Sequence, residues 1–188
     1  MITLVDNCEL QIRGIDNLVR LEARAGGDEG THAVTIRDLI RTSLRMRPNR
    51  IIVGEVRGEE TIDMLQALNT GHDGSLSTGH GNSPADMLSR LETMYSMGMS
   101  IPMNAIRRQI ASGIDIMVHL GRLRDRTRKV LEIAEIDGYD YHTDEILMHS
   151  IYEFRESGQD TDGNVLGMLV PAGKLQSRGK LYRAGIAL

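Results

Sequence analysis

Two residue types that can do chemistry stand beside short apolar segments of this chain. Glu55 follows Ile51, Ile52 and Val53, a β-branched run typical of a strand covered on both faces. His80 lies between two glycines, in a loop that follows a second short predicted strand. The carboxyl ends of parallel strands form one edge of an open α/β sheet, and ligands bind there. We therefore expect Glu55 and His80 to approach one another across a shared cleft, where the carboxylate can orient a water or hold a metal ion.

A metal site is an alternative interpretation, because His72 lies in a second Gly-His turn. His72, His80 and Glu55 would then supply the ligands of a metal-dependent hydrolase. Their spacing matches neither the H-E-x-x-H pattern nor a Cys/His zinc pattern, which disfavours this alternative. The remaining alternative is that Glu55, His72 and His80 are ordinary surface residues with no catalytic role.

Arginines recur at four-residue spacing before the apolar run of residues 51–53. The stripe is Arg37, Arg41 and Arg45, with Arg47 after it. Such a stripe is either a solvated helix face or an electropositive wall for an anionic ligand or a neighbouring subunit. Arg57 is likewise either solvated or a phosphate contact.

The elements that must position these residues alternate between strand and helix patterns. Strands are predicted over 2–5, 10–12 and 51–53, and helices over 35–47, 59–70, 83–98 and 102–112, with Gly71 as the C-cap of the second helix. Strands follow over 115–120, 130–136, 146–154 and 165–170, with turns over 122–129 and 157–164 and a short helix over 175–184. The prediction is an α/β fold with two parts, residues 1–121 as the α/β core and residues 122–188 as a strand-rich appendage.

Composition excludes several classes of protein. The net charge of -4 disfavours bulk nucleic-acid binding, which needs a basic surplus. A single cysteine, Cys8, permits no internal disulfide and suits a reducing compartment. No apolar run is long enough for a membrane span, and the N-terminus has no signal-peptide pattern. We therefore expect a cytoplasmic protein that reaches a membrane only through a partner.

The sequence also lacks the usual cradle for nucleotide phosphates. The pattern G-x-x-x-x-G-K-[ST] does not occur in it. Its two Gly-Lys pairs, ending at Lys174 and Lys180, are each followed by leucine instead of serine or threonine. The residues alone therefore predict no phosphate loop.

Four segments, taken in order and spacing, resemble the type II/IV secretion ATPases. They are VDNCEL (5–10), LRMRPNR (44–50), IIVGEVRG (51–58) and TGHDGSLSTGHGNSP (70–84). The branch they resemble is the CpaF-type ATPases of Flp (tight-adherence) pilus assembly, and residues 151–186 resemble that branch too. The resemblance covers nearly the whole chain, and the combination is far more specific than any one motif.

The resemblance implies a RecA-like P-loop NTPase core that uses ATP and Mg²⁺. The assembly implied is a homo-oligomer, a hexameric ring that powers pilus assembly or secretion beside an inner-membrane platform protein. By match, Glu55 would be the Walker B glutamate that orients the attacking water, and His80 of the His box would sense the γ-phosphate. Glu9 of the Asp box would help to hold Mg²⁺.

The remaining matched residues would bind the nucleotide or line the subunit boundary. Asp6 belongs to the Asp box, and Arg47 and Arg57 would lie near the phosphates or at the boundary. This chain has Val5 where the family has glutamate before the aspartate of that box. The departure leaves the detail of the implied Mg²⁺ site open.

The family also carries an N-terminal domain and a Walker A loop before the Asp box, and these 188 residues contain neither. The resemblance therefore implies the C-terminal part of an ATPase. We expect this polypeptide alone to bind ATP poorly and to hydrolyse essentially none. The alternative is a non-catalytic module that forms the ring without a nucleotide site of its own.

Overall fold

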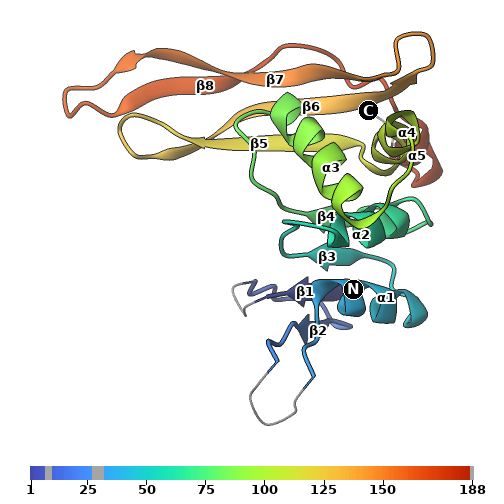
Figure 1. The fold of residues 1–188 in the computed structure, drawn as a ribbon. Coiled ribbons are helices and arrows are strands. Elements are labelled where there is room, and N and C mark those ends of the chain that lie inside the picture. Colours follow the sequence, from blue (N-terminus) through green and yellow to red (C-terminus); the bar gives the residue numbers. More distant parts are fainter. Residues whose placement is uncertain (7–9, 27–31, 187–188) are drawn as a thin grey trace.

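The computed structural model describes residues 1–6, 10–26 and 32–186. Figure 1 shows a parallel sheet at the bottom of the view and an antiparallel sheet at the top, with helices α3 and α4 between them. The α/β alternation predicted for the first part of the chain and the strand-rich second part are both present.

The parallel sheet has the order β2-β1-β3-β4. Its strands are β1 (Ile2–Val5), β2 (Val19–Glu22), β3 (Ile51–Val53) and β4 (Leu76–Ser77). All three neighbouring pairs are parallel, so β1 and β3 lie inside the sheet. Every residue of these two strands is buried, which confirms that residues 51–53 form an interior strand.

The strand predicted over residues 10–12 is wrong. The partner of β1 on that side is β2, which begins at Val19 and runs parallel to it. A parallel partner needs a crossover of about a dozen residues, and the few residues between Val5 and Leu10 are too few for one. The short-range alternation at 10–12 was a weaker constraint than this connection length.

Four helices carry the middle of the chain, as their patterns predicted. They are α1 (Ile36–Arg45), α2 (Glu60–Leu68), α3 (Pro84–Gly98) and α4 (Met103–Gly113). Thr35 and Asp38 form the full capping box of α1, and Ser83 caps α3 ahead of Pro84. The C-cap of α2 is Asn69 and not Gly71, which lies two residues on with a positive φ of 88°. None of the described helices is long and apolar enough to cross a bilayer.

The antiparallel sheet is a meander of four strands in chain order. They are β5 (Ile116–Arg122), β6 (Arg128–Asp140), β7 (Glu145–Gln159) and β8 (Val165–Pro171), and α5 (Gly179–Arg183) follows. The strands are longer than predicted, because register shifts such as that at Gly158 let pairing continue through glycine. The final helix is shorter than predicted and begins at Gly179, because the backbone N–H groups of Gln176 and Ser177 donate to Glu135.

One apolar cluster connects the two sheets. It runs from Ile2 and Leu4 in β1, through the buried faces of α2, α3 and α4, to Ile136 in β6. Helix α4 packs on both β6 and β7, and its Ile106 and Ile110 are almost fully buried. The division at residue 121 stays a prediction, since the core is continuous across it and the second sheet begins at Ile116.

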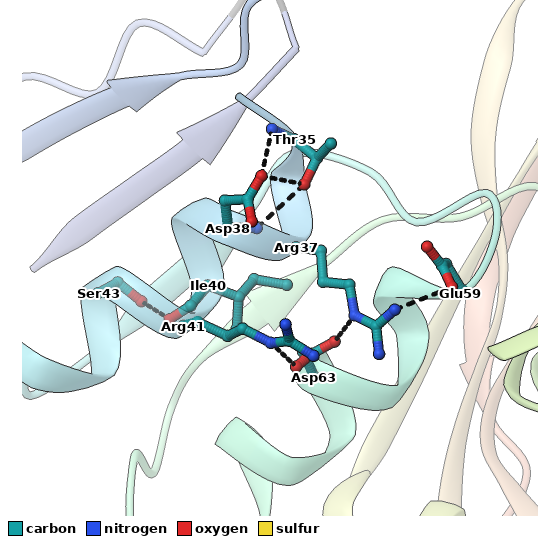
Figure 2. Close-up of polar contacts among 8 residues, drawn as sticks. All are labelled: Thr35, Arg37, Asp38, Ile40, Arg41, Ser43, Glu59 and Asp63. Atoms are coloured by element: carbon teal, nitrogen blue, oxygen red, sulfur yellow. Dashed lines mark hydrogen bonds and ion pairs between the residues drawn. The ribbon is translucent and has the colours of Figure 1, made fainter. Parts of the chain in front are cut away.

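A buried carboxylate ties α1 to α2 (Figure 2). Asp63 is 5% exposed, and its two oxygens accept hydrogen bonds from Arg37 Nε at 2.6 Å and Arg41 Nε at 2.8 Å. Arg37 also donates to Glu59 at 2.9 Å. The bond to Asp63 is the main cause that raises the pKa of Arg37. The arginine stripe is therefore partly neutralised within the chain instead of standing free in solvent.

We expect Asp63→Ala to lower the free energy of unfolding by about 2–3 kcal/mol, because it removes the buried partner of the half-buried Arg37 guanidinium and leaves it only the exposed Glu59. Arg41 adds little to this loss, since its side chain is 56% exposed. Urea denaturation measures the change. Asp162→Ala, in the exposed turn before β8, is the matched control and should cost less than about 0.5 kcal/mol. Equal effects for the two variants would contradict the assignment.

Candidate functional site

The backbone at the end of β3 packs closely against the end of β1. Gly54 donates its backbone N–H to the Leu4 carbonyl at 2.7 Å. A Cβ on Gly54 would lie 3.1 Å from Val5 Cγ1 and 3.3 Å from the Leu4 oxygen. Glycine therefore permits this approach, and the next residue, Glu55, emerges at the carboxyl edge of the sheet.

Two side chains, Arg57 and His80, contact the Glu55 carboxylate. Its Oε2 accepts a hydrogen bond from Arg57 Nε at 2.5 Å and also contacts Arg57 Nη2. Its Oε1 contacts His80 Nε2, which confirms the predicted approach of Glu55 and His80. The carboxylate is 16% exposed, whereas Arg57 and His80 are largely solvent-accessible. The catalytic roles of these residues stay predictions.

The electrostatics of this trio favour an ionised carboxylate. The hydrogen bond from Arg57 is the main cause that lowers the pKa of Glu55, burial opposes it, and His80 contributes less. The same bond raises the pKa of Arg57. Glu55 is therefore ready to accept hydrogen bonds, and it is not poised as a proton donor near neutral pH.

Pairing of β3 with β4 sets the position of His80. Val56 donates its N–H to the Thr78 carbonyl at 3.0 Å, and the Thr78 hydroxyl donates to the Gly54 carbonyl at 2.5 Å. The glycine after His80 is required by the start of α3, since a Cβ on Gly81 would lie 3.2 Å from the Met87 backbone nitrogen. The loop can therefore cross α3 closely and return towards Glu55.

Arg57 also lines a cavity of about 520 Å³. Its lining includes Asp6 at the end of β1, Arg57, and the first turns of α1 and α2. Asp6 helps to raise the pKa of Arg57, after the larger contribution of Glu55. Glu60 fixes the intervening loop, because its Oε1 accepts the N–H groups of Arg57 at 2.5 Å and Gly58 at 2.9 Å. The site thus joins Asp6, Arg57 and Glu55 along one sheet edge.

Arg47 is not brought to this edge. It follows the C-cap of α1, is exposed, and has a φ of 51°, in the left-handed region. The chain then enters the amino end of β3, whereas Glu55 follows the carboxyl end of the same strand. Arg47 and Glu55 therefore lie at opposite edges of the parallel sheet.

Two residues predicted as ligands, Glu9 and His72, are not part of the site as described. Glu9, the implied Mg²⁺ ligand, lies outside the described residues. The ring nitrogen Nδ1 of His72 lies 3.0 Å from the Ala67 carbonyl at the end of α2. Among the described residues, His72, His80 and Glu55 do not form a cluster with metal-ligand spacing. The structure gives no support to the hydrolase alternative built on His72.

Sequence reasoning missed the residues that hold the site in place. Thr78 and Glu60 position the loops around Glu55. Asp63 accepts hydrogen bonds from Arg37 and Arg41 of the arginine stripe. A signal was present for Asp63, because it stands among the apolar residues Ile62, Met64 and Leu65 of α2. A buried acid beside a basic stripe predicts an ion pair.

The comparisons with known proteins define the family. The sequence model of the type II/IV secretion system proteins matches residues 1–160. The chain therefore belongs to the type II/IV secretion system protein family.

Two curated relatives illustrate the range of similarity. The putative conjugal transfer protein Rv3659c of Mycobacterium tuberculosis (strain ATCC 25618 / H37Rv) is 44% identical over 118 residues, which are 63% of this chain and 33% of that protein. The type IV secretion system protein PtlH of Bordetella pertussis is 35% identical over 143 residues, which are 73% of this chain and 42% of that protein. The chain thus spans between a third and a half of the length of these two relatives.

A solved structure has the same α/β arrangement. The VirB11 ATPase of the Brucella suis type IV secretion system, in complex with sulphate, is 31% identical to this chain with a TM-score of 0.62. The similarity covers 70% of this chain and 40% of that protein. Over the part that is covered, the α/β fold of this chain is therefore similar to that of the VirB11 ATPase.

We expect Arg57→Ala to raise the pKa of Glu55 more than His80→Ala does, because Arg57 is the larger cause of its depression. Carboxyl carbon shifts of Glu55, followed by NMR through an acid titration, measure this. Both variants should titrate at higher pH than the wild type. Glu156 of β7, which forms an ion pair with Arg124, serves as the internal control and should titrate unchanged in both variants. The reverse order would show that His80 controls the carboxylate.

Proposed function

We propose that this chain is the C-terminal part of an ATPase that powers type II/IV secretion or pilus assembly. The observation that carries the proposal is the Glu55 carboxylate at the carboxyl edge of β3, gripped by Arg57 and His80, within the residues that match the family. In this proposal the parallel sheet is part of a RecA-like P-loop core. The resemblance of residues 151–186 favours the CpaF-type branch of Flp pilus assembly.

In the proposed reaction, Glu55 orients the water that attacks the γ-phosphate. Each of its oxygens already has a partner, one Arg57 and the other His80. A carboxylate oxygen has two lone pairs, so Oε1 can still accept a hydrogen bond from the incoming water beside its contact with His80. Arg57 is exposed and attracts phosphate oxygens, so a bound nucleotide competes with Glu55 for Arg57 and leaves the carboxylate freer to turn towards the water.

The residues at this edge also fit an Mg²⁺ ion. Asp6 is an exposed carboxylate at the end of β1, adjacent to β3, and carboxylate oxygen is the donor that Mg²⁺ prefers. Glu9, if the resemblance holds, supports the ion or its waters. When bound, Mg²⁺ neutralises charge that develops on the phosphates. Arg57, opposite Asp6, then faces the same phosphate group.

The phosphate cradle itself is proposed to come from another part of the protein. The cavity beside Arg57 mixes the carboxylates of Asp6, Glu59 and Glu60 with arginines, and Arg37 is already paired with Asp63. Such a lining gives little net attraction for a triphosphate, which needs oriented backbone N–H groups and added positive charge. A Walker A loop supplies both.

Assembly and partners follow from the same proposal. Arg47 lies at the opposite edge of the sheet from the site of its own chain, so any role for it in hydrolysis requires a neighbouring copy, as in the proposed hexameric ring. The ring is proposed to work in the cytoplasm, held at the inner membrane by a platform protein of the secretion or pilus machinery.

In the protein that carries the phosphate loop, we expect Glu55→Gln to reduce ATP hydrolysis at least about 100-fold and to leave nucleotide binding largely intact. The amide keeps the shape of the side chain but loses the charge that orients the water. Phosphate release and binding of a fluorescent nucleotide measure the two quantities. Glu145→Gln, at the exposed start of β7, should leave both unchanged. Wild-type turnover in Glu55→Gln would exclude Glu55 as the carboxylate that orients the water.

For the 188-residue polypeptide alone, we expect no shift in melting temperature with millimolar Mg-ATP. A ligand at about 100 times its dissociation constant adds roughly 2.7 kcal/mol to native-state stability, so real binding would be visible in a thermal melt. A gain of several degrees would show that these residues hold the nucleotide without a Walker A loop. If the complete protein also fails to bind ATP, the alternative of a non-catalytic ring-forming module is favoured.

A further inference from the structure

The segment after β8 folds back over the antiparallel sheet. Residues 172–183 lie beyond the part of the chain that matches the family. The backbone N–H of Ala172 donates to the Ile151 carbonyl of β7 at 3.0 Å. Gly173 then lies against the sheet so closely that a Cβ would be 2.5 Å from the Ser150 carbonyl oxygen. The segment is therefore fitted to this surface from its first residues.

A buried carboxylate grips the next residues of the segment. Glu135 of β6 is 1% exposed, and its two oxygens accept the backbone N–H groups of Gln176 at 2.7 Å and Ser177 at 2.6 Å. A buried charge is costly unless it is hydrogen-bonded, and here backbone donors from the segment meet that need. Release of the segment would expose this carboxylate to water and end both bonds.

His149 of β7 makes a second attachment. Its Nδ1 lies 2.8 Å from Asp137 Oδ2, and its Nε2 lies 3.0 Å from the Lys174 carbonyl oxygen. Both partners are acceptors, so both ring nitrogens must carry protons for both bonds to form. The docked segment therefore requires His149 as an imidazolium.

The far end of the segment reaches the α/β part of the chain. Lys180 in α5 pairs with Asp115 at 2.8 Å and with Asp73 at 3.2 Å. Asp73 lies in the turn between α2 and β4, and Ser75 of that turn accepts the N–H of Ile51 at the start of β3. The segment thus joins the antiparallel sheet to the turn that leads into β4.

We propose that residues 172–183 form a proton-dependent clasp, which ties the antiparallel sheet to the turn before β4 and opens as the pH rises. Glu135, Asp137 and His149 have ligand atoms within 4.8 Å of one another, as in metal sites. However, Glu135 already bonds to two backbone N–H groups and His149 bonds through both nitrogens. These contacts suit a clasp and leave no lone pair on His149 for a metal.

The direction of the pH effect follows from the groups that face His149. These are Asp137 and Glu135 of β6 and the Lys174 carbonyl of the segment. The hydrogen bond to Asp137 and then that to Lys174 raise the pKa of His149 above 6.5, against an opposing contribution from burial. A raised pKa in the docked state gives stability that is complete below the undocked pKa and is lost as pH rises through the docked one.

Hydrogen–deuterium exchange of residues 174–178 in the full chain tests the clasp. After correction for intrinsic rates, the opening constant should rise by up to about tenfold per pH unit above about pH 6.5 and then level off. His149→Gln should be more open than wild type at pH 6 and show no slope. His142→Gln, in the exposed turn after β6, should keep the wild-type profile.

Three results would overturn the clasp. A flat wild-type profile or a retained slope in His149→Gln would remove the imidazolium from the account. Protection that appears only with added Zn²⁺, and shows no pH slope without it, would assign the three side chains to a metal.

Lys180→Met tests the connection to β4 separately. Exchange in residues 71–77 should rise several-fold, while residues 174–178 stay protected at pH 6, because Glu135 and His149 still hold them. Lys174→Met is the control, since only the backbone carbonyl of Lys174 makes the bond to His149. Unchanged exchange in 71–77 would show that the segment does not restrain the turn.

Discussion

The interaction on which the site depends is the parallel pairing of β3 with a strand on each side. Ile51, Ile52 and Val53 pair with β1 and β4 and are buried on both faces. Each such side chain stabilises the fold by about 1.5–3 kcal/mol when fully buried, so the register of this short strand is strongly fixed. Because both neighbours are parallel, the loops after β1, β3 and β4 emerge at one edge. That geometry brings Asp6, Glu55 and His80 together.

The charges around this edge are divided between structure and site. Asp63 pairs with Arg37 and Arg41 and holds α1 to α2, so part of the positive charge of these arginines is neutralised before it reaches the cavity. Arg57 remains at the edge, where it forms an ion pair with Glu55, the candidate catalytic carboxylate. A phosphate that attracts Arg57 therefore also alters the freedom of Glu55. The ion pair between Arg57 and Glu55 therefore couples the binding of an anion to the ability of the Glu55 carboxylate to orient a water.

Local patterns were enough to predict the parts of the molecule that depend on near neighbours. The buried run before Glu55, the capping box at Thr35 and the helix start at Ser83 each follow from a few adjacent residues. The partner of β1 could not be found this way, since parallel pairing joins segments separated by a crossover. The same holds for Glu135, whose two backbone partners lie more than 40 residues further along the chain. Its burial depends on a segment that local pattern had assigned to a helix.

The antiparallel sheet is more than an attachment to the α/β part. Six of the nine residues of α2 are buried, although a helix that covers only one face of a sheet keeps about half of its surface in water. Helix α1 covers one side of α2, and α3 and α4 cover another, while α4 in turn packs on β6 and β7. Removal of the antiparallel sheet would expose the apolar face of α4, including Ile106 and Ile110. It would also remove the support of α4, which packs against α2. Since α2 begins just after Arg57 and ends just before the turn into β4, the sheet supports both loops that carry the candidate site.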